Sequence, residues 1–97
     1  MAKQLPPLHP GEVLREEFME PLNLSAGKLA KACLVPRTRF ARLACEEAGL
    51  SGDTAIRLAK LFGTSAEFWL KLQVQFDAET AQRAAAKDLD AIKPLDR

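Results

Sequence analysis

The sequence has few of the residues on which disulfide-rich domains, metal centres and most catalytic sites depend. Its 97 residues include two cysteines, one histidine and no tyrosine. Two cysteines, Cys33 and Cys45, are too few for a disulfide scaffold or a complete cysteine zinc site. The histidine, His9, has no visible nucleophile and orienting partner, and no glycine-rich phosphate loop is present. We therefore expect no enzymatic activity, catalytic residue, metal, cofactor or small-molecule substrate.

Long apolar runs are also missing. No stretch approaches the roughly 18 uninterrupted apolar residues of a membrane helix. The first ten residues contain three prolines and one lysine but no apolar segment of the kind found in signal peptides. We therefore expect a cytoplasmic protein that does not contact a membrane. The shares of apolar residues, 47%, and charged residues, 28%, are ordinary for one small globular domain and exclude a wholly disordered chain.

One stretch of the chain lacks acidic residues altogether. No Asp or Glu lies between Glu20 and Glu46, although the chain has 13 acidic and 14 basic residues and a net charge of +1. The basic residues of this stretch are Lys28, Lys31, Arg37, Arg39 and Arg42. A basic block in a near-neutral protein indicates either a surface for an anionic partner or a merely solvated face.

Alanine and leucine far outnumber the β-branched residues, and no alternating strand pattern or hairpin signal occurs. After an extended arm over residues 1–9, we predict five helices, over residues 10–20, 26–33, 36–48, 52–62 and from 66 to about 77. Three serines, Ser25, Ser51 and Ser65, are suited to cap the second, fourth and fifth helices. We predict one domain over residues 10–79. In the tail, residues 80–97, the chain either extends the fifth helix, packs on a partner or frays.

The segment from Ser25 to Ala44 carries most of the functional information. It is a short helix, a break of about three residues and a second short helix whose outer face is basic, which is the order of a helix-turn-helix unit. The second helix of such a unit enters the major groove, where arginine can bind guanine, while other donors bind phosphates. The predicted DNA-binding residues are Ser25, Lys28, Arg37, Thr38, Arg39 and Arg42.

Residues 9 to about 79 resemble the HigA family of antitoxins, a branch of the Xre/Cro-type helix-turn-helix proteins. The residues that carry the resemblance are His9–Glu12, Leu14–Phe18, Leu22, Leu24–Ser25, Leu29–Ala30, Val35–Arg39, Leu50–Ser51, Asp53–Ala55, Arg57–Ala59, Phe62–Ser65 and Glu67–Gln73. The resemblance implies an all-α, five-helix lambda-repressor-like helix-turn-helix domain with a C-terminal helical tail.

The same resemblance implies a function. It implies a homodimeric antitoxin of a type II toxin–antitoxin system that represses its own operator on double-stranded DNA. It also implies that the protein binds and neutralises a HigB-like toxin, an mRNA endonuclease. Two alternatives stay open: a stand-alone Xre-type repressor without a toxin, and a helical protein-interaction module with weakened DNA binding.

The sequence departs from the family pattern around the basic block. Leu34 stands where relatives usually have a glycine, which predicts an altered turn because a left-handed leucine is strained. Ala26 replaces a usual glutamine and removes a phosphate donor. Cys45–Ala48, Cys-Glu-Glu-Ala, replaces a basic loop that contains a glycine. We therefore expect the third helix to continue to about Ala48, and Glu46 and Glu47 to weaken DNA binding.

Half of the six aromatic residues lie close together in the predicted fifth helix. A chain of this length has little interior to bury them, and a two-fold dimer would bury the excess and space two recognition helices by one DNA turn, about 34 Å. We predict a dimer through this helix and the tail. The predicted interface residues are Phe68, Trp69, Leu72 and Phe76.

Overall fold

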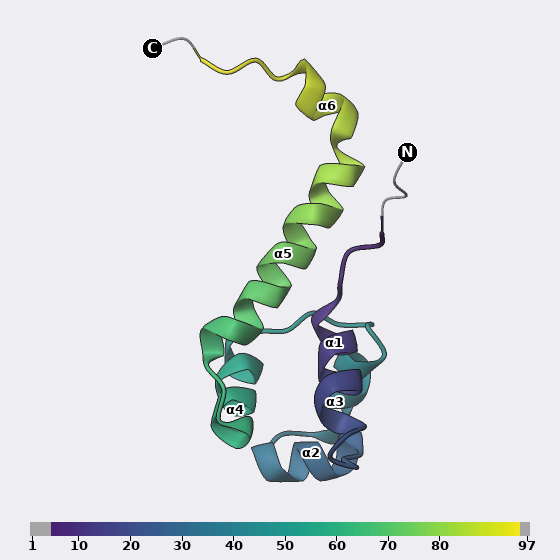
Figure 1. The fold of residues 1–97 in the computed structure, drawn as a ribbon, viewed down its shortest axis with the longest axis vertical. Coiled ribbons are helices and arrows are strands. Elements are labelled where there is room, and N and C mark those ends of the chain that lie inside the picture. Colours follow the sequence, from purple (N-terminus) through teal and green to yellow (C-terminus); the bar gives the residue numbers. More distant parts are fainter. Residues whose placement is uncertain (1–4, 96–97) are drawn as a thin grey trace.

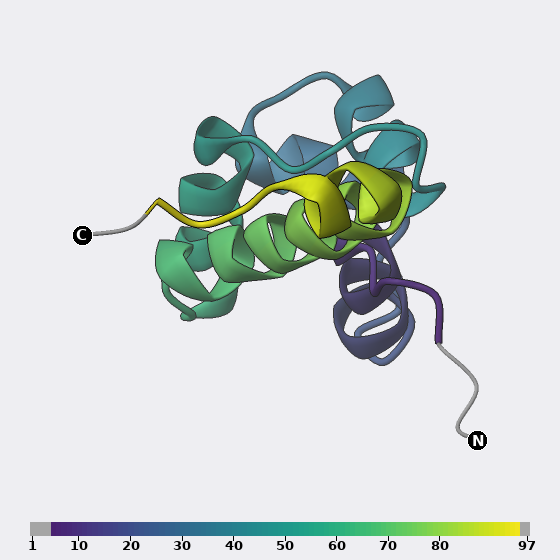
Figure 2. The ribbon, with the colours of Figure 1, turned by 90° about the horizontal axis from the view of Figure 1, so that it is seen from above.

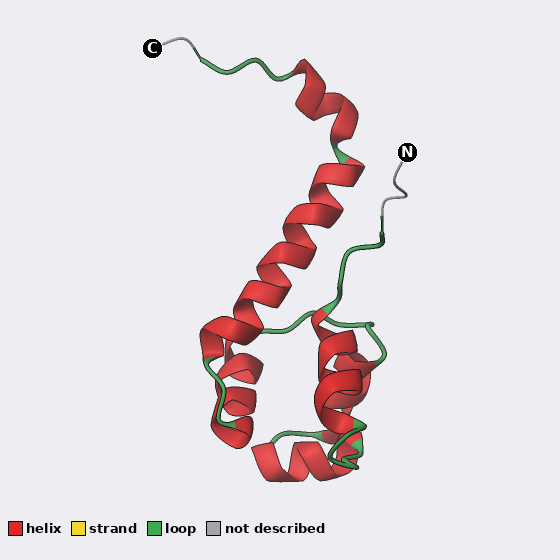
Figure 3. Cartoon of the chain, in the orientation of Figure 1, coloured by secondary structure: helices red, strands yellow, loops and turns green. Residues whose placement is uncertain are grey.

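The computed structural model describes residues 5–95, which form helices joined by loops and contain no strand (Figure 3). The predicted all-α class is therefore confirmed. The elements in chain order are α1 (Pro10–Val13), the π-helix η1 (Leu14–Met19), α2 (Ala26–Cys33), α3 (Arg37–Ala44), α4 (Gly52–Phe62), α5 (Ala66–Ala84) and α6 (Ala86–Ala91). Over the described part of the chain, no helix has the length and apolar character needed to cross a membrane.

The helices from α1 to α4 and the first half of α5 form the body of the domain, from which the rest of α5 and α6 project (Figure 1). The molecule accordingly measures 52 × 33 × 21 Å along its principal axes. Figure 2 shows α5 lying along one side of the body with α6 continuing from its far end. Of the three outcomes open for the residues after position 79, the structure shows a continuation of the fifth helix to Ala84.

Three helices begin at the predicted serines. The side-chain oxygen of Ser25 accepts a hydrogen bond from the backbone N–H of Lys28 at 3.1 Å. The side-chain oxygen of Ser51 accepts one from the backbone N–H of Thr54 at 3.2 Å. Ser65 does the same for Phe68 at 3.0 Å. Each serine satisfies one N–H group that the first turn of a helix leaves free, so the sequence signal and the observed helix starts agree.

The first predicted helix is only partly α-helical, which no pattern in the sequence indicated. After α1 the backbone widens into η1, where the N–H of Glu20 donates to the carbonyl of Arg15, five residues back, at 2.9 Å. Residues five apart lie close to one face in this wider winding. Leu14 and Met19, at 0% and 8% exposure, can therefore both face the core.

The third helix ends four residues earlier than predicted. It stops at Ala44 because Glu46 adopts a left-handed conformation with φ 62°. The Glu47 N–H then donates to the Arg42 carbonyl at 2.8 Å, and the Glu46 N–H donates to Leu43 at 3.0 Å. These two bonds satisfy the last carbonyls of the helix in the pattern usually closed by a glycine.

Leu34 ends α2 in the same way, so the expectation of an altered turn was wrong. Its φ is 62°, and the Val35 N–H donates to the Ala30 carbonyl at 3.0 Å. The left-handed turn of the helix-turn-helix unit is thus kept without glycine. The leucine side chain is 83% exposed, so little burial offsets the backbone strain.

We expect Leu34→Gly to stabilise the protein by about 1 kcal/mol, because glycine adopts the left-handed conformation without strain. Urea unfolding followed by circular dichroism measures this change. Leu34→Ala is the matched control, since it removes the exposed side chain but keeps the Cβ atom that causes the strain. A glycine variant no more stable than the alanine variant would contradict the prediction.

The core joins α5 to the helix-turn-helix unit. Six large side chains in it are at most 1% exposed: Leu14, Leu29, Phe40, Leu43, Leu58 and Trp69. Phe18 packs against two other rings: its ring centroid lies 4.7 Å from that of Phe62 and 5.0 Å from that of Trp69. The Trp69 Nε1–H donates to the Thr64 hydroxyl at 2.9 Å. Trp69 therefore belongs to the core of one chain, and the prediction that it lies at a dimer interface was wrong.

Candidate nucleic-acid interface

Helices α2 and α3 each have eight residues and are joined by Leu34, Val35 and Pro36. Leu29, Ala30 and Cys33 of α2 pack inward with Phe40 and Leu43 of α3. This packing fixes α3 against α2 and leaves the opposite face of α3 free. The free face begins at the N-terminus of α3, where a recognition helix makes its base contacts.

The six predicted DNA-binding residues lie at the surface. Ser25, Lys28, Arg37, Thr38 and Arg42 are exposed, and Arg39 is half-buried. The stem of Arg37 passes beside the first turn of α2, because a Cβ atom built on Gly27 would lie 3.6 Å from its Cδ. The N-termini of α2 and α3 therefore share one cationic surface, which also carries the positive end of the α2 dipole.

Arg39 is not a free side chain, which the sequence did not reveal. Its guanidinium forms an ion pair with the carboxylate of Asp53, at the start of α4. Asp53 also accepts a hydrogen bond from Nε of Arg57 at 2.9 Å. The bond from Arg39, followed by that from Arg57, lowers the pKa of Asp53 below its ordinary value. Asp53 is therefore ionised at neutral pH, and its ion pair with Arg39 favours the orientation of the guanidinium seen here.

Arg57 connects this pair to the turn of the helix-turn-helix unit. Its Nη1 donates to the backbone carbonyl of Cys33 at 2.7 Å, at the last residue of α2. Since that carbonyl lies at the negative end of the helix, the guanidinium stabilises the end of α2. The only sequence signal for this role was the spacing of four residues between Asp53 and Arg57 on one helix.

We expect Asp53→Asn to reduce the specificity of DNA binding rather than its overall strength. The change frees Arg39 from its fixed orientation, which weakens base contact. It also removes a negative charge beside the phosphates, which strengthens binding to any sequence. The ratio of specific to non-specific affinity should fall about tenfold, which is within the range of discrimination that one good base contact provides. Competition with random duplex measures this ratio, and an unchanged ratio would contradict the assigned role of Asp53.

The acidic loop after α3 is partly neutralised by a residue far away in the sequence. Arg15 of η1 donates to the carbonyl of Ala44, at the end of α3, and lies 3.4 Å from a carboxylate oxygen of Glu46. The hydrogen bond to Glu16 is the largest cause that raises the pKa of Arg15; burial opposes it, and the hydrogen bond and charge of Glu46 add to it. Glu46 is thus paired with a cation, while weakened DNA binding by the whole loop stays a prediction.

The structure gives His9 a capping role in α1 and places the two cysteines, Cys33 and Cys45, in different environments. Nδ1 of His9 accepts a hydrogen bond from the N–H of Gly11 at 2.9 Å and caps α1. Cys33 is buried, which raises the pKa of its thiol, whereas Cys45 is exposed. Among residues 5–95, no three His, Cys, Asp or Glu side chains gather where they could hold a metal ion.

Two short helices joined by a three-residue turn, with cationic N-termini on one surface, define a helix-turn-helix protein. No protein-family model matches the chain. Virulence-associated protein I of Dichelobacter nodosus is 42% identical over 92 residues, which is 95% of this chain and 84% of that protein. Antitoxin HigA-1 of Vibrio cholerae is 33% identical over 89 residues, covering 92% and 84% of the two chains.

Solved structures agree with these relatives. The Pseudomonas aeruginosa antitoxin HigA, solved with the higBA promoter, has a TM-score of 0.89 and 41% identity over 92% of this chain and 98% of its own. Antitoxin GraA in complex with its operator has a TM-score of 0.90 and 36% identity, covering 100% and 99% of the two chains. The chain belongs to the HigA family of helix-turn-helix antitoxins.

Proposed function

We propose that this protein is a dimeric autorepressor that binds its own operator through α3 and neutralises a HigB-like toxin. The observation that carries the DNA-binding part is the basic surface shared by the N-termini of α2 and α3, with Arg39 oriented by Asp53. Relatives with the same fold and 36–41% identity were solved with promoter or operator DNA, which supports the assignment. In this proposal the protein is cytoplasmic, binds DNA and a toxin, and is not an enzyme.

Fluorescence anisotropy with a duplex from the region upstream of its gene tests operator binding. We expect sub-micromolar affinity, resistance to random competitor DNA, and an affinity that falls steeply with salt as phosphates are neutralised. Weak binding that ignores sequence would contradict the autorepressor and favour the helical interaction module.

We propose a surface for the dimer that differs from the one predicted at Phe68, Leu72 and Phe76. Phe68 and Leu72 line a groove against α1, and Phe76 packs on the ring of His9 at a centroid distance of 4.7 Å. Three apolar residues along α5 and α6 are instead exposed: Val74 in the middle of α5, Leu89 in α6 and Ile92 directly after it, at 66%, 46% and 65%. We therefore place the proposed two-fold contact there, where exposed apolar side chains have no cover within the described chain.

Sedimentation equilibrium tests this dimer contact. Val74→Lys with Ile92→Lys should convert a dimer into a monomer without unfolding it, because both side chains lie at the surface. Exposed Gln75 and Lys87, changed to alanine, give a control that leaves the apolar residues in place. A dimer that survives the lysine substitutions would contradict this location.

Antitoxin function is tested with the small protein encoded beside this chain's gene. Co-expression should yield a stable complex and should relieve growth arrest caused by that protein alone. A stand-alone repressor would bind the operator but would have no such partner, so this experiment distinguishes an antitoxin from a stand-alone repressor.

A further inference from the structure

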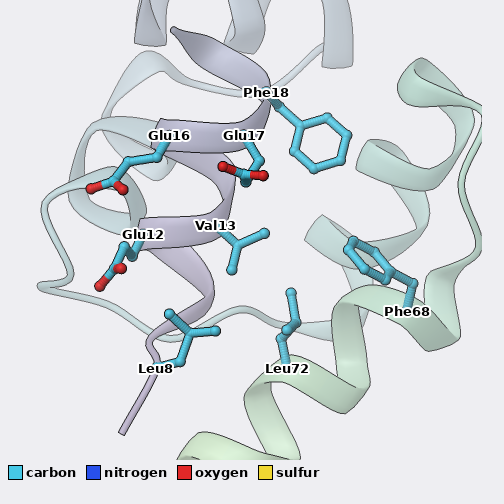
Figure 4. A pocket seen from close by; sticks show the side chains of 8 residues that line it. All are labelled: Leu8, Glu12, Val13, Glu16, Glu17, Phe18, Phe68 and Leu72. Carbon is cyan, nitrogen blue, oxygen red and sulfur yellow. The ribbon is translucent and has the colours of Figure 1, made fainter. Parts of the chain in front are cut away.

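An open groove of about 590 Å³ lies between the N-terminal segment and the first turns of α5. Figure 4 shows five apolar side chains projecting into it: Leu8, Val13, Phe18, Phe68 and Leu72. Leu8 is 47% exposed and Phe68 is 40% exposed, although both are large apolar residues. Apolar surface of this kind, left open by the chain itself, is typical of a site that contacts another protein.

One wall of this groove is acidic. Glu12, Glu16 and Glu17 line it, and Figure 4 shows the Glu17 carboxylate nearer the groove and those of Glu12 and Glu16 on the outer side of the same ribbon. From Pro10 to Glu20 the chain has four glutamates and one arginine. A partner that fits the groove must therefore pair an apolar side chain with positive charge.

A second copy of this chain does not meet that requirement. In a two-fold contact the same patch faces itself. Glu12, Glu16 and Glu17 of one copy would then approach the same carboxylates of the other, and like charges facing one another oppose association. The only arginine of this segment, Arg15, is already engaged with Glu16 and Glu46.

We propose that this groove is the docking site for the toxin, which inserts an apolar side chain flanked by lysine or arginine residues. The proposal rests on the proposed antitoxin function. An enzyme that cleaves mRNA must itself present positive charge to bind phosphates, so its surface is complementary to the three glutamates. None of the groove residues belongs to the predicted DNA-binding set, so a toxin side chain in the groove would leave those residues uncovered.

Titration calorimetry of the purified adjacent-gene toxin onto the full-length protein tests this site. The variant Glu12→Gln, Glu16→Gln, Glu17→Gln removes the charges of the acidic wall. The control variant Glu79→Gln, Asp88→Asn, Asp90→Asn removes as much charge from α5 and α6. We expect the first variant to bind toxin about tenfold more weakly and with less salt dependence. The control should stay within about twofold of wild type, and operator affinity should not fall in either variant.

Phe68→Ala tests the apolar wall and should also weaken toxin binding while the protein stays a dimer. Equal toxin affinity in the wild type and the first variant, or an equal loss in both charge variants, would overturn the docking site. A change from dimer to monomer caused by Phe68→Ala would overturn it as well, since the groove would then be a contact between copies. Absence of toxin binding by the wild type would refute the antitoxin function itself, which is a separate result.

Discussion

Replacing Arg39 with alanine is expected to weaken binding to the operator by about 1–3 kcal/mol, which is about 5- to 150-fold in affinity. Two effects act in the same direction. The variant loses a donor at the start of the recognition helix, and it leaves the Asp53 carboxylate with one cation fewer beside the phosphates. Specificity should relax at one base position while the salt dependence changes little, as anisotropy with point-substituted duplexes would show.

Lys28→Ala provides the contrast. Its backbone N–H is bound to Ser25, but the exposed ammonium is placed to bind a phosphate. We expect affinity to fall alike for all sequences and the slope of log affinity against log salt to flatten by about one unit. If both variants bind as the wild type does, α3 is not the recognition helix.

Gly11→Ala is expected to cost at least about 3 kcal/mol of stability. A Cβ atom at Gly11 would lie 1.9 Å from the carbonyl oxygen of Leu43, on the backbone of α3. Backbone atoms cannot turn aside as a flexible side chain can, so α1 would have to move away from α3. For a domain of this size, the midpoint of thermal unfolding should fall by about 12 °C or more.

Gly52→Ala is the matched control for that substitution. Gly52 is the first residue of α4, and an added Cβ meets nothing within 4 Å. Alanine there should leave stability unchanged or raise it slightly, because it favours the helix more than glycine does. Circular dichroism melts of the two variants side by side decide the matter, and equal melts would contradict the close approach of α1 and α3.

The family and the basic surface could be predicted from the sequence because their signals are short in range. A serine that caps a helix binds an N–H three residues away, and a run without acidic residues is visible in the sequence itself. The start of α2 and the exposed positions of Arg37 and Thr38 follow from such signals. The network around Arg39 does not, because Asp53 is 14 residues away and on another helix.

What the sequence by itself determined is the all-helical class, the helix starts and the basic residues at the surface of α2 and α3. The tertiary structure alone decided the orientation of Arg39, the burial of Trp69 and the early end of α3 at a left-handed Glu46. The physical reason is the distance along the chain between interacting groups. Arg15 meets the end of α3 from 29 residues away. Contacts of that range depend on how the helices pack, which no local pattern of residues specifies.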